Sequence, residues 1–110
     1  FIENKNKQLM KYKIAGRKCG IVFAGNCNKS ELGNVLATNN PDIDLIVIID
    51  TTKAVSYRTT RDDVECNKFA ELFGGGGHQK ASGSGFTDEM REEIIKNYFK
   101  DVKRLEDNKN

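Results

Sequence analysis

The chain has 110 residues, which is enough for one domain with a single core and too few for a second core. Apolar residues make up 37% and charged residues 31%, a globular composition once glycine is counted, which excludes disordered and fibrous classes. The net charge of +2 is far below that of proteins that grip long duplex nucleic acid, so any phosphate contact is expected to be local.

Compartment and chain boundaries follow from a few simple features. The longest apolar run, Leu45–Ile49, lies between Asp44 and Asp50, and the first residues carry no apolar secretion core, so we expect no membrane partner. The three cysteines cannot all pair and lack C-x₂-C spacing, which favours buried thiols in a reducing cytoplasm over a zinc site. Because the chain begins with Phe1, we expect residues 1–10 to be a linker or tail from a missing upstream domain.

The first half of the chain predicts a hairpin, a helix and a buried strand. Two β-prone runs, 12–15 and 20–24, flank turn residues 16–19. A helix is expected to open at Ser30 and to stop before Pro41, because the residue before a proline avoids the α region. The continuous run Leu45–Ile49 predicts a central strand that is covered on both faces.

The second half predicts a strand, a helix, another strand and a long final helix. Residues 54–60 alternate, with Val55, Tyr57 and Thr59 on the packed side. Asp62 or Asp63 is expected to cap a helix that ends at Gly74, and a strand is expected over 82–86. The final helix starts at Asp88 and is expected to cover the sheet with one apolar face, which comprises Met90, Ile94, Ile95, Tyr98, Phe99, Val102 and Leu105. Residues 106–110 are expected to fray. Together these elements predict a single α/β domain with a central mixed sheet of about five strands and helices packed on it.

The segment Gly74–Gly83 is the most informative part of the sequence. Four consecutive glycines are entropically costly in ordered structure, so an ordered run indicates close approach of the backbone to something. Successive glycine amides can form a nest that binds an anion, and the only histidine, His78, follows directly. The alternatives are a flexible linker and a histidine that satisfies only a local hydrogen bond.

This segment resembles the signature of the DHH-associated domain of the DHH phosphoesterases, Gly-Gly-Gly-Gly-His-x-x-Ala-Ser/Ala-Gly after a helix. The upstream run Ser56–Thr59 resembles the family's Ser-x-Arg-Ser/Thr strand. The family includes single-strand exonucleases, oligoribonucleases and cyclic-dinucleotide phosphodiesterases. The resemblance is clearest over Ser30–Phe86 and implies that 11–105 form a DHH-associated substrate-binding domain.

The resemblance also implies a division of labour. The family's N-terminal domain holds two manganese ions through an Asp-His-His run and other ligands, and this chain has no such run. We therefore expect no catalytic or metal-binding residue here, a hydrolase as the parent protein, and no activity from this chain alone. The expected partners are short single-stranded RNA or DNA, or a nucleotide, and the N-terminal DHH domain of the same chain. The expected substrate-binding residues are Arg58, Gly74, Gly75, Gly76, Gly77, His78 and Ser82.

Several alternatives stay open at this point. Arg58 offers a planar fork for phosphate, yet a surface ion pair with Asp62, Asp63 or Glu65 is the competing interpretation. The chain can also be a standalone nucleic-acid-binding module, as in the related C-terminal domain of alanyl-tRNA synthetases, although that branch generally lacks the histidine. A third hypothesis is a dimerisation domain in which the final helix supplies the interface. Lys80, Asn26 and Asn28 are not assigned to the site, because solvation and turn geometry explain them.

Overall fold

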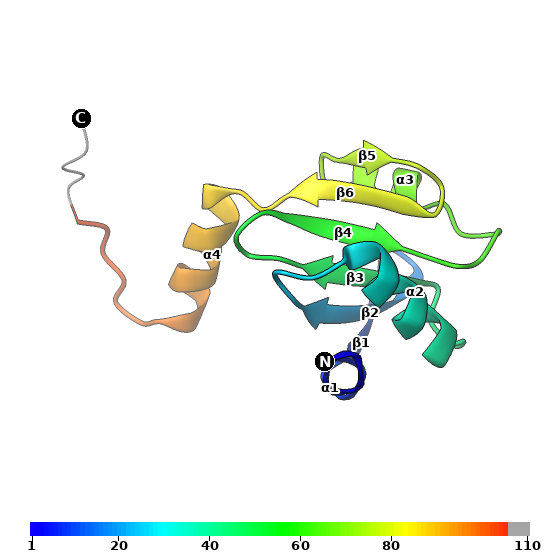
Figure 1. Ribbon diagram of the computed structural model, residues 1–110. Coiled ribbons are helices and arrows are strands. Elements are labelled where there is room, and N and C mark those ends of the chain that lie inside the picture. Colours follow the sequence, from blue (N-terminus) through cyan, green and yellow to red (C-terminus); the bar gives the residue numbers. More distant parts are fainter. Residues whose placement is uncertain (106–110) are drawn as a thin grey trace.

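The computed structural model describes residues 1–105 (Figure 1). One mixed sheet has the strand order β1-β2-β3-β4-β6-β5, with β2 and β3 parallel and the other neighbours antiparallel. The strands are β1 (Met10–Ile14), β2 (Arg17–Phe23), β3 (Leu45–Ile49), β4 (Ala54–Arg58), β5 (Gly76–Gly77) and β6 (Ala81–Gly85). The helices are α1 (Ile2–Lys7), α2 (Lys29–Asn39), α3 (Cys66–Glu71) and α4 (Asp88–Tyr98). The predicted α/β domain with a mixed sheet is therefore confirmed, with one more strand than the expected five.

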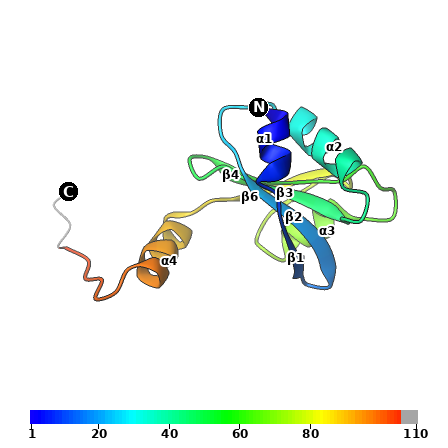
Figure 2. The same ribbon diagram turned by 90° about the horizontal axis from the view of Figure 1, so that it is seen from below.

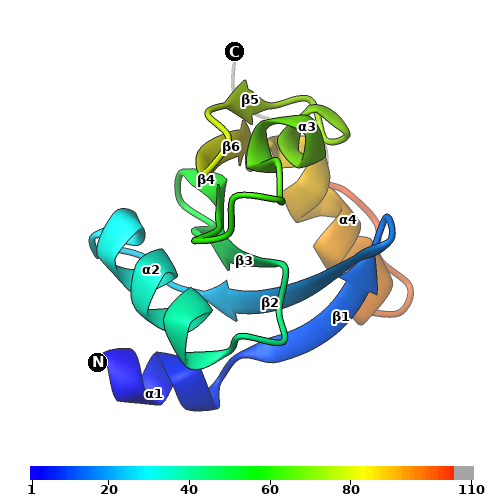
Figure 3. The same ribbon diagram turned by 90° about the vertical axis from the view of Figure 1, so that its right-hand side faces the viewer.

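The two faces of the sheet carry separate hydrophobic clusters, with α1 and α2 on one side and α3 on the other (Figure 3). We call these the α2 face and the α3 face. The middle strand β3 contributes alternately to both, since Ile46 and Ile48 pack toward α2 while Leu45 and Val47 pack in the other cluster. This two-sided burial explains the continuous apolar run that predicted the strand.

Two local predictions at the start of the chain differ from the structure. The hairpin turn is Ala15–Gly16 rather than residues 16–19, and both residues have positive φ, 51° and 82°, which suits a two-residue hairpin loop. Arg17 to Cys19 are consequently part of β2. Residues 2–7, expected to lie in a linker or tail, form α1, which packs against α2.

Two helix starts were also predicted at the wrong residue. Helix α2 is capped by Asn28, whose side chain accepts a hydrogen bond from the Glu31 amide at 3.0 Å, so it begins before Ser30. Helix α3 begins after Glu65 without a side-chain cap. Asp63 instead forms a two-pronged contact with the Arg61 guanidinium, at 3.0 and 2.8 Å.

The expected packing of the final helix on the sheet is wrong. Helix α4 forms where predicted, capped by Thr87, but it has no buried residue and extends away from the sheet (Figures 1 and 2). Ile94 is 51% exposed and Tyr98 is 80% exposed. Val102 and Leu105 lie beyond the end of the helix, and the predicted frayed segment 106–110 is outside the described residues.

The cysteines and the helices were the basis of the expected compartment, and the structure describes both. Cys19 and Cys66 are buried and Cys27 is partly buried, and each is a free thiol. Burial raises the pKa of Cys19 and of Cys66 to about 11. None of the helices over residues 1–105 is long and apolar enough to cross a membrane.

Candidate functional site

Arg58 and His78 lie in one row across the sheet. Arg58 on β4 pairs with Ala81 on β6, and Ala81 exchanges two backbone hydrogen bonds with His78, at 2.8 and 3.2 Å. Directly opposite residues of neighbouring strands share a face, and two strand spacings amount to about 10 Å. The register therefore places both residues on the α2 face. The distance of about 10 Å between them is comparable to the length of one nucleotide.

The Arg58 side chain lies along helix α2 and lines an open cleft. Its stem crosses Gly33, where an added Cβ would stand 2.6 Å from Arg58 Cγ and 2.7 Å from Arg58 Cβ. Its Nε is buried and has no hydrogen-bond partner among the described residues. The cleft has a volume of about 550 Å³ and is lined by Ser30, Asn34, Arg58, Thr59, Thr60, Lys80 and Ala81.

The carboxylates that competed for Arg58 in the sequence have other partners. Within residues 1–105, no ion pair joins Arg58 to a carboxylate. The three candidates pair as Asp62 with Lys80, Asp63 with Arg61 and Glu65 with Lys68. A permanently charged guanidinium facing a cleft without a carboxylate partner is suited to an anion from outside the chain.

The glycine run is a turn and a short strand rather than an open nest. Gly74 has φ +80° after α3, and the Gly75 amide donates to the Ala70 carbonyl at 2.9 Å, as in a helix C-cap. A Cβ on Gly75 would stand 2.0 Å from the Gly83 carbonyl oxygen, and Gly77 combines φ +143° with a close approach to Ser82. The close approach inferred from the sequence is thus to strand β6. Gly76 alone in the run has neither a positive φ nor a neighbour within 4 Å of an added Cβ.

Ser82 is separated from the other predicted binding side chains. It pairs with Tyr57, so it projects to the α3 face, and its hydroxyl donates to the His78 carbonyl at 2.6 Å. His78 itself is exposed at the end of the β5–β6 hairpin. The structure therefore brings Arg58 and His78 together on one face and uses Ser82 to hold the hairpin.

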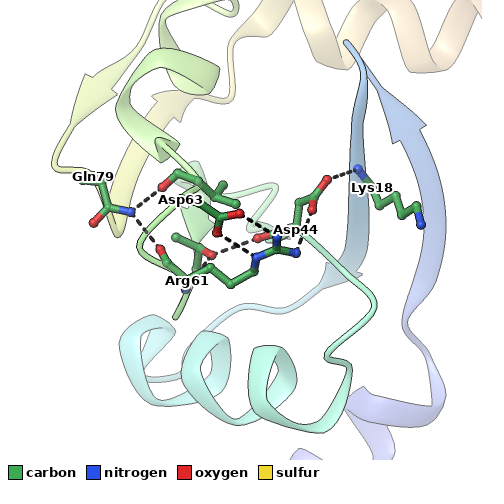
Figure 4. A network of polar contacts seen from close by, with 7 residues as sticks. Lys18, Asp44, Arg61, Asp63 and Gln79 are labelled. Atoms are coloured by element: carbon green, nitrogen blue, oxygen red, sulfur yellow. Dashed lines mark hydrogen bonds and ion pairs between the residues drawn. The ribbon is translucent and has the colours of Figure 1, made fainter.

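Gln79 anchors this hairpin and was not recognised from the sequence. Its side-chain NH₂ donates to the Arg61 carbonyl at 2.9 Å and to the Val64 carbonyl, and the Gln79 backbone carbonyl accepts from the Cys66 backbone amide at 2.8 Å. Arg61 also reaches Asp44 at 2.9 Å, so one polar network joins the hairpin tip, the segment before α3 and the segment before β3 (Figure 4). This network fixes the position of His78 relative to β4.

The sequence analysis missed two cleft residues of α2, Ser30 and Asn34, and also Gly33, which contacts the Arg58 stem. Ser30 and Asn34 are one helical turn apart on the exposed side of α2, and this polar pair has no distinctive pattern of its own. Gly33 did offer a signal, because glycine is a poor residue for a helix interior and its presence there indicates a packing reason.

A second hollow of about 570 Å³ lies at the carboxyl ends of β2 and β3 and includes Asn26. Beside it, hydrogen bonds from Thr52 and the ammonium of Lys29 lower the pKa of Asp50 to about 2. Asp50 is therefore a carboxylate with its partners supplied by the chain. Among residues 1–105, no three His, Cys, Asp or Glu side chains gather as metal ligands would, so the described residues do not fit a manganese site.

Comparison with known proteins follows the fold. Two solved structures share it: an uncharacterized protein from Helicobacter pylori G27 (TM-score 0.60, 24% identity, 91% of this chain and 30% of that chain) and the pGpG-specific phosphodiesterase PggH from Vibrio cholerae (TM-score 0.53, 12% identity, 88% and 35%). No protein-family model matches the chain.

A curated relative is similar in sequence. The chain is 37% identical over 101 residues to oligoribonuclease NrnB of Bacillus subtilis, a match that covers 91% of this chain and 25% of that protein. The chain thus spans about a quarter of the length of this relative. The two solved structures show a shared fold, and the sequence match relates this chain to about a quarter of an oligoribonuclease.

Proposed function

We propose that the chain is the C-terminal substrate-binding domain of a DHH-family phosphodiesterase, and that Arg58 and His78 hold a phosphate end of short single-stranded nucleic acid or of a related nucleotide. The observation that carries the proposal is the Arg58 guanidinium, which lines an open cleft and has no carboxylate partner within residues 1–105. A permanently charged guanidinium without an ion-pair partner favours an anion bound in the cleft.

Each residue has a distinct role in this proposal. The planar Arg58 guanidinium makes a bidentate contact with phosphate oxygens, and the imidazole of His78, about 10 Å away along the row, donates to a neighbouring oxygen of the same ligand. Ser30 and Asn34 provide polar groups at the cleft wall for the sugar or base. The exposed Lys80 is paired with Asp62 at 2.8 Å and contributes only diffuse charge.

Hydrolysis belongs to residues outside this chain in the proposal. Two manganese ions held by an N-terminal domain would activate the attacking water, while this domain positions the phosphate. Three free thiols, two of them buried, support a reducing compartment, and we place the protein in the cytoplasm.

The binding role is tested by titrating the purified chain with a 5′-phosphorylated RNA dinucleotide, with inorganic phosphate as competitor. Arg58→Ala removes a buried charged contact worth about 2–5 kcal/mol, so we expect the Kd to rise by about 30-fold or more. His78→Ala should weaken binding by a smaller factor, because the imidazole is exposed. Circular dichroism checks that each variant keeps the fold.

Lys53→Ala is the matched control, since it removes an exposed cation that lines the hollow at the opposite end of β3. Equal affinities for the wild type, Arg58→Ala and His78→Ala contradict the site, and a loss confined to Lys53→Ala moves binding to the other hollow. A manganese-dependent release of mononucleotides that scales with the concentration of this chain contradicts the division of labour.

A further inference from the structure

The α3 face of the sheet carries an apolar groove that is covered only in part. It has a volume of about 430 Å³ and lies between α3, the β1–β2 hairpin and the first turn of α4. Beyond it the same face continues over edge strand β1, where Met10 is 40% exposed and Tyr12 is 58% exposed. The groove itself is lined by Ile14, Ile21, Val47, Ile49, Val55, Tyr57, Phe69, Phe73, Ser84, Gly85 and Met90.

Helix α4 has an apolar stripe that is largely uncovered. Met90, Ile94 and Tyr98 recur every four residues and therefore lie on one side of the helix, with Ile95 beside them. Between 37% and 80% of each of these four side chains is exposed. A monomeric domain rarely leaves such a stripe open, so the stripe indicates a binding surface.

The helix is held away from the groove of its own chain. The Arg91 guanidinium donates to the Thr51 carbonyl at 2.6 Å and lies over the Phe86 ring, 5.0 Å from its centroid. These contacts fix the first turn of α4 against the β3–β4 turn, and Met90 is the one α4 residue that lines the groove. The helix itself extends away from the sheet (Figure 2). The other three residues of the stripe therefore have no apolar surface of their own chain to pack on, and a second molecule would have to supply one.

The two elements that carry the groove and the stripe have net charges of opposite sign. The hairpin 10–23 carries four basic residues and no acidic residue, whereas α4 carries four acidic residues and two basic ones. Arg17 pairs with Ile14 across the hairpin, which places it on the same face as the groove, and it has no ion-pair partner in the described part of the chain. Lys11, Lys13 and Lys18 alternate to the opposite face of the hairpin, so Arg17 is the one hairpin cation on the groove face.

We propose that two copies of this chain form a symmetric dimer in which the apolar stripe of α4 from each copy fills the apolar groove of the other. One chain supplies both an apolar helix face without a groove and an apolar groove without a helix, which is the requirement for a self-complementary, two-fold interface. The dimensions agree, because an 11-residue helix is about 16 Å long and the four strands from β1 to β4 span about 14 Å. The Arg58 row lies on the opposite face and stays open in the dimer.

Sedimentation equilibrium of the 110-residue chain, from micromolar to millimolar concentration, measures the dimer directly. Ile94→Glu places a charge in the stripe at a position that is exposed in the monomer, so the monomer fold is retained. Burying an isoleucine is worth at least about tenfold in an equilibrium constant, and a two-fold interface contains it twice, so we expect about a hundredfold rise in the dimer dissociation constant. Tyr12→Glu adds a charge of the same sign as the net charge of α4 and should weaken the dimer from the groove side.

Asn97→Glu is the matched control, because it adds the same charge at an exposed polar position of α4 and should leave the dimer intact. Circular dichroism of all three variants confirms that the fold is unchanged. A chain that is monomeric throughout the concentration range overturns the proposal. A dimer that tolerates both Ile94→Glu and Tyr12→Glu, or that all three variants weaken equally, overturns it as well.

Discussion

Two neighbouring glycines, Gly75 and Gly76, should respond in opposite ways to the same substitution. In Gly75→Ala the new methyl group would stand 2.0 Å from the Gly83 carbonyl oxygen and 2.8 Å from Ser84 Cβ. The first of these is a backbone atom of β6, which cannot turn aside, so β5 must move away by more than 1 Å to reach an ordinary contact of about 3.4 Å. Overpacking together with weakened β5–β6 hydrogen bonds should lower the free energy of unfolding by about 2–4 kcal/mol.

Gly76→Ala meets no such obstacle. No atom lies within 4 Å of its added Cβ and its φ is not positive, so the free energy of unfolding should stay equal or rise by up to about 1 kcal/mol. Urea unfolding followed by circular dichroism measures both variants. Equal losses in the two variants would refute the explanation of the glycine run by strand contact. If a ligand approaches the backbone at Gly76, as the sequence predicted, dinucleotide affinity falls in Gly76→Ala without a loss of stability.

Three further substitutions test the surroundings of the site. Gly33→Ala gains helix propensity but displaces the Arg58 stem, so stability should fall by only about 1 kcal/mol while dinucleotide affinity falls about tenfold; unchanged affinity in a titration would contradict this. Gln79→Ala leaves two carbonyls without their donor and should cost about 1–3 kcal/mol in urea unfolding. The pKa of Asp50 is below its ordinary 3.8, so its ionised form stabilises the fold above pH 4 and this contribution is lost as the pH falls toward 2. The difference in unfolding free energy between wild type and Asp50→Asn should therefore narrow over that interval, and a constant difference would contradict the assigned cause.

The elements that were predicted correctly from the sequence are those in which the pattern of apolar side chains follows the pattern of burial. Leu45–Ile49 reads as a two-sided strand because both faces are buried, and the alternation over 54–58 reports one packed face. Helix α4 shows the limit of this reasoning. Its periodicity identifies an apolar stripe, but periodicity does not say which surface the stripe meets. Strand β5 has no side chains, so its pairing left no pattern to read.

In the candidate site, too, some residues could be recognised from the sequence and others could not. Arg58 and His78 are chemically distinctive residues, and their placement in one row depends on the register of β4, β6 and β5, which the sequence does not display. Gln79 was missed because an amide that binds backbone carbonyls is indistinguishable in sequence from a solvated one. The apparent cap at Asp62 or Asp63 failed for a related reason, since Arg61 offered Asp63 a stronger partner than the helix amides.

Arg58 and His78 lie in segments that differ in their resistance to local opening. Strand β4 is bonded on both sides within the sheet, whereas β5 is a two-residue edge strand of exposed glycines. Local opening of an edge segment requires far less free energy than global unfolding, so backbone amides near His78 should exchange with deuterium long before those of β4. Ligand release can then begin by fraying of this edge alone, with the guanidinium still in place for the next molecule.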